Sequence, residues 1–242
     1  MKAKILILLP TLNEVQYISK LYKRILSLKL NFNYLFIDDG SNDGTWEIIK
    51  KIKKNKKNKV FTIKRKNREG IGKAHKDGLN WAYKKKYKYL VTMDTDFAHD
   101  PKYIPQLIKK IRNADLIIGS RYLRKNSTPN WPLLRLFLTH GAHFTTFLLF
   151  GHKFDSTNSF RCYNLKKINK NFILYCKSND YDFFFTSLAI LNLKKHKIVE
   201  IPMILKSRII GNSKNYIKYI FKSIFMMFYV FFKIKFNYRF KL

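Results

Sequence analysis

The chain has 242 residues, and 46% of them are hydrophobic, which is enough for one large domain or for one domain with an appendage. Its 49 Lys and Arg residues outnumber 15 Asp and Glu residues, giving a formal net charge of +34. This charge attracts nucleic acid or anionic lipid headgroups, or it reflects a composition rich in Lys, Asn, Ile and Phe, so charge alone names no partner. Two cysteines without a CxxC pair argue against a disulfide scaffold and against a zinc site.

Strand-length apolar runs alternate with stretches of helical periodicity through the first half of the chain. The predicted strands are residues 4–9, 33–37, 60–64, 89–93 and 115–119, and the predicted helices are 14–28, 46–54, 70–84 and 101–112. The first run is too short for a signal peptide and lacks a small-residue cleavage site, so it is predicted to be a buried strand. The alternation predicts an α/β fold with a mostly parallel sheet flanked by helices.

After residue 125 the chain contains two aromatic and apolar blocks, residues 130–151 and 216–236. The uninterrupted apolar part of the second block, Ile224 to Phe232, has nine residues, whereas a helix that crosses a bilayer needs about 20. Lys218, Lys222 and Lys233 lie near one helical face of this block, as in a helix that lies in the membrane interface. The alternative is a C-terminal helix docked on its own domain or on a second subunit.

Acidic residues follow two of the predicted strands. Asp38 and Asp39 end the second strand, and Asp94 and Asp96 follow the fourth. Ligands of open parallel sheets bind at the carboxyl ends of the strands, so these acids are predicted to line a site. Two carboxylates at positions i and i+2 repel each other, and a divalent cation would compensate them. The alternatives are that Asp94 and Asp96 cap the next helix and that residues 38–45 form a plain Asx-rich turn.

Eight short motifs occur in order along the chain. They are LPTLNE (9–14), IDDGSNDGT (37–45), NREGIGKA (67–74), MDTD (93–96), GSRY (119–122), WPLLR (131–135), SFRCY (159–163) and SRIIGNSK (207–214). Together they resemble the family 2 glycosyltransferases of GT-A fold, and within them the dolichyl-phosphate (polyprenyl-phosphate) mannosyltransferase group. The resemblance covers residues 4–215. It implies a Rossmann-like GT-A domain over residues 1–215 and an amphipathic, membrane-interfacial segment over residues 216–242.

The resemblance implies a donor site and a metal site at the motifs nearest the N-terminus. The residues that would hold the donor nucleotide are Pro10, Leu12, Glu14, Ile37, Asp39, Asp94 and Thr95. Asp94 and Asp96 would bind Mg²⁺ or Mn²⁺, and Asp96 is counted among the catalytic residues. Two positions depart from the pattern: Leu12 replaces the usual aromatic residue, and Ala98 stands where some members carry a further metal ligand.

The later motifs imply a site for the acceptor phosphate. The residues that would bind it are Arg121, Arg135, Thr139, Arg208 and Lys214, and the three arginines are also assigned as catalytic. Asp155 and Asn158 lead into Ser159–Arg161, which resembles a structural segment of the family. Phe184 and Thr186 occupy positions where similar enzymes carry Gln and Glu.

The implied reaction is a metal-dependent, inverting transfer of a sugar to a polyprenyl or dolichyl phosphate at the cytoplasmic face of a membrane. GDP-mannose is the expected donor. The protein is expected to be a peripheral membrane protein, and a membrane partner subunit is a further possibility. The alternative enzyme transfers glucose from UDP-glucose to a polyprenyl phosphate or to a surface polysaccharide. Outside enzymes, the alternatives are an inactive membrane scaffold and a basic nucleic-acid-binding protein. The gathering of aromatic residues into two apolar blocks argues against binding of nucleic acid.

Overall fold

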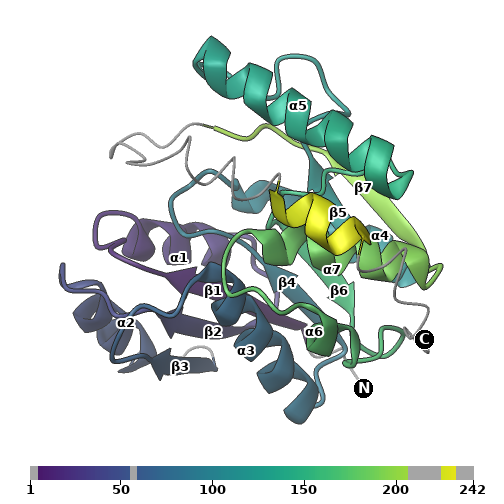
Figure 1. The fold of residues 1–242 in the computed structure, drawn as a ribbon. Coiled ribbons are helices and arrows are strands. Elements are labelled where there is room, and N and C mark those ends of the chain that lie inside the picture. Colours follow the sequence, from purple (N-terminus) through teal and green to yellow (C-terminus); the bar gives the residue numbers. More distant parts are fainter. Residues whose placement is uncertain (1–4, 55–58, 207–224, 233–242) are drawn as a thin grey trace.

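The computed structural model describes residues 5–54, 59–206 and 225–232, and its centre is a seven-stranded sheet in the order β3-β2-β1-β4-β6-β5-β7 (Figure 1). The strands are β1 (Ile5–Thr11), β2 (Asn33–Asp38), β3 (Val60–Lys64), β4 (Tyr89–Thr92), β5 (Leu116–Ser120), β6 (Arg161–Asn164) and β7 (Ile198–Pro202). The α-helices are α1 (Ile18–Leu26), α2 (Thr45–Lys54), α3 (Ile71–Lys84), α4 (Ile104–Lys110), α5 (Leu133–Phe150), α6 (Phe172–Tyr175) and α7 (Asp182–Leu193).

The mostly parallel α/β sheet predicted from the sequence is confirmed, and so are its first five strands. The exception to the parallel order is β6, which pairs antiparallel with β4 on one side and with β5 on the other. Because β6 runs the opposite way, the residues that precede it lie at the carboxyl ends of β4 and β5. The sequence did not predict β6 or β7.

The helix predicted over residues 14–28 begins later, at Ile18, because Glu14 to Tyr17 form a turn in which the Glu14 carbonyl accepts from the Tyr17 and Ile18 amides. The helix predicted over residues 101–112 consists of three consecutive pieces. They are a 3₁₀ turn at Pro101–Tyr103, α4, and a second 3₁₀ turn at Ile111–Asn113.

Both faces of the sheet are covered, which explains the continuous apolar run of β1. Ile7 and Leu9 pack in one cluster with α1, α2 and α4, whereas Leu6 and Leu8 pack in a second cluster with α3, α6 and α7. Successive side chains of a strand point to opposite faces, so a strand between two helical layers is apolar at every position.

Helix α5 lies at the margin of the sheet and packs little of its surface against the domain (Figure 1). Thr146 is its one buried residue. Its large exposed side chains are Leu133, Leu134, Phe137, Phe144, Phe147 and Leu148. Within the described part of the chain, α5 is the one helix that is long and apolar enough to cross a membrane by length and composition.

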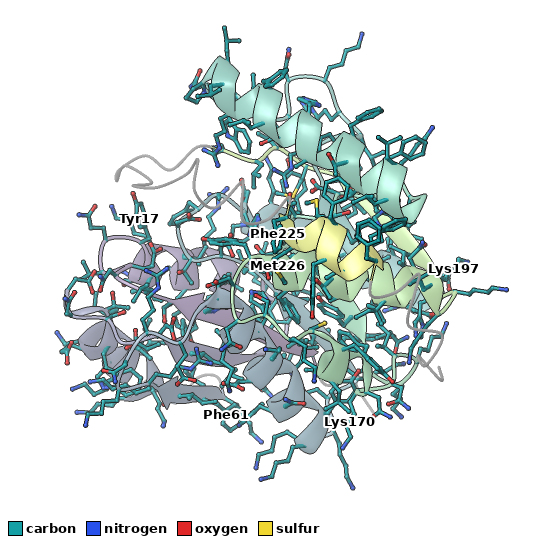
Figure 2. All side chains as sticks on the ribbon, in the orientation of Figure 1. Tyr17, Phe61, Lys170, Lys197, Phe225 and Met226 are labelled. Atoms are coloured by element: carbon teal, nitrogen blue, oxygen red, sulfur yellow. The ribbon has the colours of Figure 1, made fainter. Side chains whose placement is uncertain are left out.

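Residues 225–232 are helical and lie between α5 and α7 (Figure 1). Met227 and Val230 are buried in a small cluster with Phe185 of α7, against which Leu149 and Phe150 of α5 pack. The described part of the predicted C-terminal helix therefore contacts its own domain, as the docked alternative requires. Figure 2 labels Phe225 and Met226 on this segment.

The opposite side of the same segment is open to solvent. Its exposed aromatic residues are Phe225, Phe228, Tyr229 and Phe232. The rest of the predicted helix, including Lys218, Lys222 and Lys233, lies outside the described residues.

Candidate active site

Asp94 and Asp96 follow the carboxyl end of β4, as predicted. The Asp94 carboxylate accepts a hydrogen bond of 2.8 Å from the Ser159 hydroxyl, and the Asp94 amide donates to Nδ1 of His99 at 3.0 Å. The ring is buried and stacks on Phe160, with centroids 5.1 Å apart. His99 therefore supports the backbone of the Asp-x-Asp turn.

The turn that carries Asp96 is tied to its neighbours on both sides. The Asp96 carboxylate accepts from the Ala98 amide at 3.0 Å, and the Thr95 hydroxyl donates to the carbonyl of Pro10 in β1 at 3.3 Å. The next helical turn is capped by Asp100, whose side chain accepts from the Lys102 amide at 3.0 Å. The alternative that the Asp94–Asp96 pair serves as this cap is therefore wrong.

The two carboxylates fit a hard divalent cation that takes its other ligands from a substrate. The Asp94 side chain is 35% exposed, and Asp96 is buried. No group of three or more His, Cys, Asp or Glu side chains able to hold a metal occurs among residues 5–54, 59–206 and 225–232. Mg²⁺ commonly binds to one or two carboxylates together with phosphate oxygens and water, and this donor set matches that chemistry.

Hydrogen bonds join the loop after β2 to the turn after β1. The Asp38 carboxylate accepts from the Ser41 hydroxyl at 2.5 Å, and the Ser41 hydroxyl in turn accepts from the Asn13 amide at 2.9 Å. Asp43 accepts from the Thr45 hydroxyl at 2.6 Å and from the Val15 amide at 3.1 Å. Burial acts to raise the pKa of Asp43, but these hydrogen bonds outweigh it and lower the pKa. Asx turns do form here, and they also fix the loop beside the end of β1.

The predicted donor residues of β1 and β2 lie around this junction. Pro10 and Ile37 are buried in adjacent strands, in register with each other. Leu12 is half-buried in the turn after β1, and Glu14 is buried with its amide donating to the Thr45 hydroxyl at 2.8 Å. Gly40 has φ +87°, and a Cβ there would lie 3.2 Å from the Asn67 carbonyl carbon. A side chain is therefore unfavourable where the loop after β2 approaches the Asn67 backbone.

Asp39 is held by partners that the sequence did not predict. Its Oδ1 accepts from Nη1 of Arg65 at 2.7 Å and from the Glu69 amide at 3.0 Å, and its Oδ2 accepts from the Gly70 amide at 2.9 Å. Arg65 is itself buried and donates to Asp77 at 2.5 Å. A carboxylate offers about four acceptor positions, so Asp39 retains about one for a further hydrogen-bond donor.

Arg121, at the carboxyl end of β5, forms a buried ion pair with Asp155. Its Nε and Nη2 donate to the two Asp155 oxygens at 2.8 Å each, and Nη2 also donates to the Thr157 hydroxyl at 2.7 Å. Asp155 is fully buried, and its amide donates to the Glu200 carboxylate of β7 at 2.6 Å. Burial raises the pKa of Glu200, and the nearby Asp155 charge adds to this rise.

The guanidinium groups of Arg121 and Arg135 both lie near the ring of Trp131. The guanidinium carbon of Arg135 lies 3.6 Å from the centroid of the Trp131 ring, and that of Arg121 lies 5.8 Å from it. Thr139, one turn further along α5, accepts at its carbonyl from the Tyr122 hydroxyl at 3.2 Å. Arg208 and Lys214, the two other predicted phosphate ligands, lie outside the described residues.

A comparison with protein families identifies the family of the chain. The sequence pattern described as "Glycosyl transferase family 2" matches residues 6–172. The chain belongs to glycosyltransferase family 2.

Two curated relatives of this family 2 enzyme carry names that describe lipid-linked mannose transfer. One is the polyprenol monophosphomannose synthase of Mycolicibacterium smegmatis, 32% identical over 213 residues, which cover 86% of this chain and 80% of the relative. The other is the undecaprenyl-phosphate mannosyltransferase of Micrococcus luteus, 28% identical over 214 residues, which cover 87% of each protein.

The fold of the family 2 enzyme matches solved structures of glucosyl-3-phosphoglycerate synthase from Mycobacterium tuberculosis. The complex of that enzyme with Mn²⁺, UDP and phosphoglyceric acid aligns with a TM-score of 0.68 at 16% identity, covering 96% of this chain and 78% of that one. Its complex with Mg²⁺ and UDP aligns with a TM-score of 0.64 at 15% identity, covering 96% and 80%. These similarities support the GT-A fold predicted from the sequence.

Two of the four positions that depart from the family pattern lie in the core of the glycosyltransferase. Phe184 and Thr186 are buried in α7, and the Phe184 carbonyl accepts from the Arg161 guanidinium at 2.9 Å. Arg161 is fully buried and also donates to the carbonyls of Ser156 and Asn158, so its segment has the structural role expected of it.

Proposed function

We propose that this family 2 glycosyltransferase transfers mannose from GDP-mannose to a polyprenyl or dolichyl phosphate, with inversion at the anomeric carbon and with Mg²⁺ or Mn²⁺. The observation that carries the proposal is the meeting of two functional groups at one edge of the sheet. The carboxylates of Asp94 and Asp96 follow β4, and the arginines gathered around Trp131 follow β5. An acidic pair suits a metal–diphosphate leaving group, and a basic pair suits an acceptor phosphate.

On the donor side, Pro10, Leu12, Glu14, Ile37 and Thr95 would surround the nucleotide, and Asp39 would accept a hydrogen bond from the base. A cation held by Asp94 and Asp96 would neutralise charge on the diphosphate. Asp94 and Asp96 offer two carboxylate ligands, and Ala98 offers no third one. This agrees with a cation whose coordination is completed by the phosphates of the donor.

On the acceptor side, Arg121, Arg135, Thr139, Arg208 and Lys214 would hold the lipid phosphate. The phosphate is ionised at neutral pH, so its oxygen attacks the anomeric carbon without a protein base. The new bond joins that oxygen to the anomeric carbon as the bond from the anomeric carbon to the donor phosphate breaks, and GDP leaves with the electron pair. Positioning and charge neutralisation then account for catalysis.

The exposed apolar surface of α5 supports a peripheral location on a membrane, which we assign to the cytoplasmic face. Leu133, Phe137, Phe144 and Leu148 are all exposed and recur on one side of the helix. This stripe, together with the aromatic residues of 225–232, would enter the lipid interface and bring the acceptor phosphate to Arg135 in the first turn of α5. Residues 1–215 would form the catalytic domain, and residues 216–242 would add to membrane binding.

Donor choice is tested by incubating the purified protein in mild detergent with a polyprenyl phosphate, Mn²⁺ and labelled GDP-mannose, with UDP-glucose in a parallel reaction. The proposal predicts label in the organic phase from GDP-mannose and little from UDP-glucose. Transfer only from UDP-glucose would overturn the choice of sugar, and no transfer from either would overturn the choice of acceptor.

A further inference from the structure

The five-residue segment Asp155–Ser159 touches both halves of the site. It immediately precedes β6, whose antiparallel direction brings the start of that strand to the carboxyl ends of β4 and β5. Asp94 follows β4 and Arg121 follows β5, so this segment lies between the acidic group and the basic group.

At its last residue, the segment holds the metal motif. The Ser159 hydroxyl donates to Asp94 at 2.8 Å, and the Ser159 carbonyl accepts from the Thr92 hydroxyl of β4 at 2.5 Å. Ser159 is 5% exposed, so neither bond exchanges readily with water. The hydrogen bond from the Ser159 hydroxyl fixes the orientation of the Asp94 carboxylate.

At its first residues, the segment holds the acceptor arginine. Asp155 binds Arg121 through both carboxylate oxygens, and the Thr157 hydroxyl accepts from the same Nη2 at 2.7 Å. Between the two ends, the Asn158 side chain donates to the Gly119 carbonyl of β5 at 2.5 Å and accepts from the Phe160 amide at 2.9 Å. The segment is therefore anchored to β5 as well as to β4.

We propose that residues 155–159 form a bridge that fixes the spacing between the donor–metal carboxylate and the acceptor arginine, with Ser159 and Thr157 as positioning residues at its two ends. The inference rests on the proposed donor and acceptor roles of Asp94 and Arg121. Each end of the bridge acts on a different substrate, so the two ends should be separable by measurement.

The test uses Ser159→Ala and Thr157→Val in the full-length protein, with Ser156→Ala as the matched control. The Ser156 hydroxyl donates to the Phe154 carbonyl at 3.2 Å, so its removal deletes a hydroxyl of the same segment whose hydrogen bond stays within its own loop. Thr157 is chosen over Asp155 because removing a fully buried charge partner tends to unfold the protein.

Three quantities are measured for each variant: Mn²⁺ affinity in the presence of GDP by electron paramagnetic resonance, the KM for polyprenyl phosphate, and Tm. Ser159→Ala should weaken Mn²⁺ binding roughly tenfold and leave the acceptor KM unchanged, since partners of a metal ligand typically contribute 10- to 100-fold. Thr157→Val should raise the acceptor KM roughly five- to tenfold and leave Mn²⁺ affinity unchanged, the size expected for one ordinary hydrogen bond, since Arg121 stays paired with Asp155. Ser159→Thr should restore Mn²⁺ binding.

Each outcome decides between the bridge and the proposed function. An active wild type in which both variants behave like Ser156→Ala would overturn the bridge and leave the proposed function intact. A wild type that binds Mn²⁺ with GDP, loses that binding in Ser159→Ala, and transfers no mannose would overturn the acceptor assignment and keep the metal end of the bridge. A wild type that neither binds Mn²⁺ with GDP nor transfers mannose would overturn both.

Discussion

His75 should make the protein sensitive to mild acid. Its ring is fully buried between α3 and α7, against Phe183 and Phe184, and neither ring nitrogen has a hydrogen-bond partner among the described residues. Burial, with a smaller contribution from the Arg161 charge, lowers the pKa of His75 to about 3. Since the usual histidine pKa is about 6.5, the unfolded chain takes up a proton first as the pH falls.

The stabilising effect of the neutral ring is therefore complete above about pH 6.5 and is lost as the pH falls towards 3. By linkage, about 2 kcal/mol of the free energy of unfolding is lost through His75 between pH 7 and pH 5. For a domain of this size, that loss corresponds to a Tm lower by about 4–8 °C. His152, whose pKa burial lowers to about 4, should act in the same direction.

The assay compares thermal unfolding at pH 7 and pH 5 for the wild type and for His75→Leu. The leucine side chain suits the apolar surroundings and cannot titrate, so the Tm difference between pH 7 and pH 5 should shrink by about 4–8 °C. His140→Leu, at an exposed position of α5, is the matched control and should keep the wild-type pH dependence. Equal pH dependence in His75→Leu and in the wild type would refute this reasoning.

Three further changes test packing, membrane contact and acceptor binding. Gly72→Ala places a Cβ 2.4 Å from the Asp180 carbonyl oxygen, so it should lower the free energy of unfolding by about 2 kcal/mol in urea titrations, and a neutral effect would contradict the close packing of α3. Phe137→Ser combined with Leu148→Ser should weaken sedimentation with anionic liposomes by at least about 100-fold, because each side chain contributes about 1.5–3 kcal/mol when buried. Leu174→Ser, on α6 far from α5 in Figure 1, should leave liposome binding unchanged, and equal losses would argue against an α5 docking face. Arg135→Ala should lower kcat/KM for polyprenyl phosphate roughly 100-fold while leaving GDP binding intact, and a parallel loss of GDP affinity would place this arginine at the donor instead.

The local sequence pattern was sufficient to predict the strands that are buried on both faces of the sheet. The run of β1 is apolar at every position because helices cover both sides of it, and the acids after β2 and β4 follow directly from where those strands end. The first five strands and the position of the Asp-x-Asp turn were therefore predictable from residues a few positions apart.

The later strands were not predictable in this way. Arg161 in β6 and Glu200 in β7 interrupt short apolar runs, and a charged residue in a short run argues against a buried strand. Arg161 is tolerated at 0% exposure because it donates to Ser187 and to the carbonyls of Ser156, Asn158 and Phe184. Those partners come together only in the folded chain.

The same reason explains what sequence reasoning missed in the site. The Arg65 pairing with Asp39 and the Ser159 contact with Asp94 join positions 26 and 65 residues apart in the chain. Their residue types are common, and no local spacing distinguishes them from Arg and Ser residues at the surface. The resemblance to a family gave the proposed reacting groups, whereas the structure identified the side chains that contact them.

The proposed role of the Asp-x-Asp turn is tested by comparing mannose transfer by the wild type with that by Asp96→Ala and by Asp100→Ala. Asp100 is a neighbouring carboxylate that caps the next helical turn, so it controls for loss of charge in the same loop. With labelled GDP-mannose, polyprenyl phosphate and Mn²⁺, we expect lipid-linked mannose from the wild type and from Asp100→Ala, and a loss of at least about 100-fold in Asp96→Ala. Equal transfer by Asp96→Ala and the wild type would show that this Asp-x-Asp turn is not the metal-binding centre of the reaction.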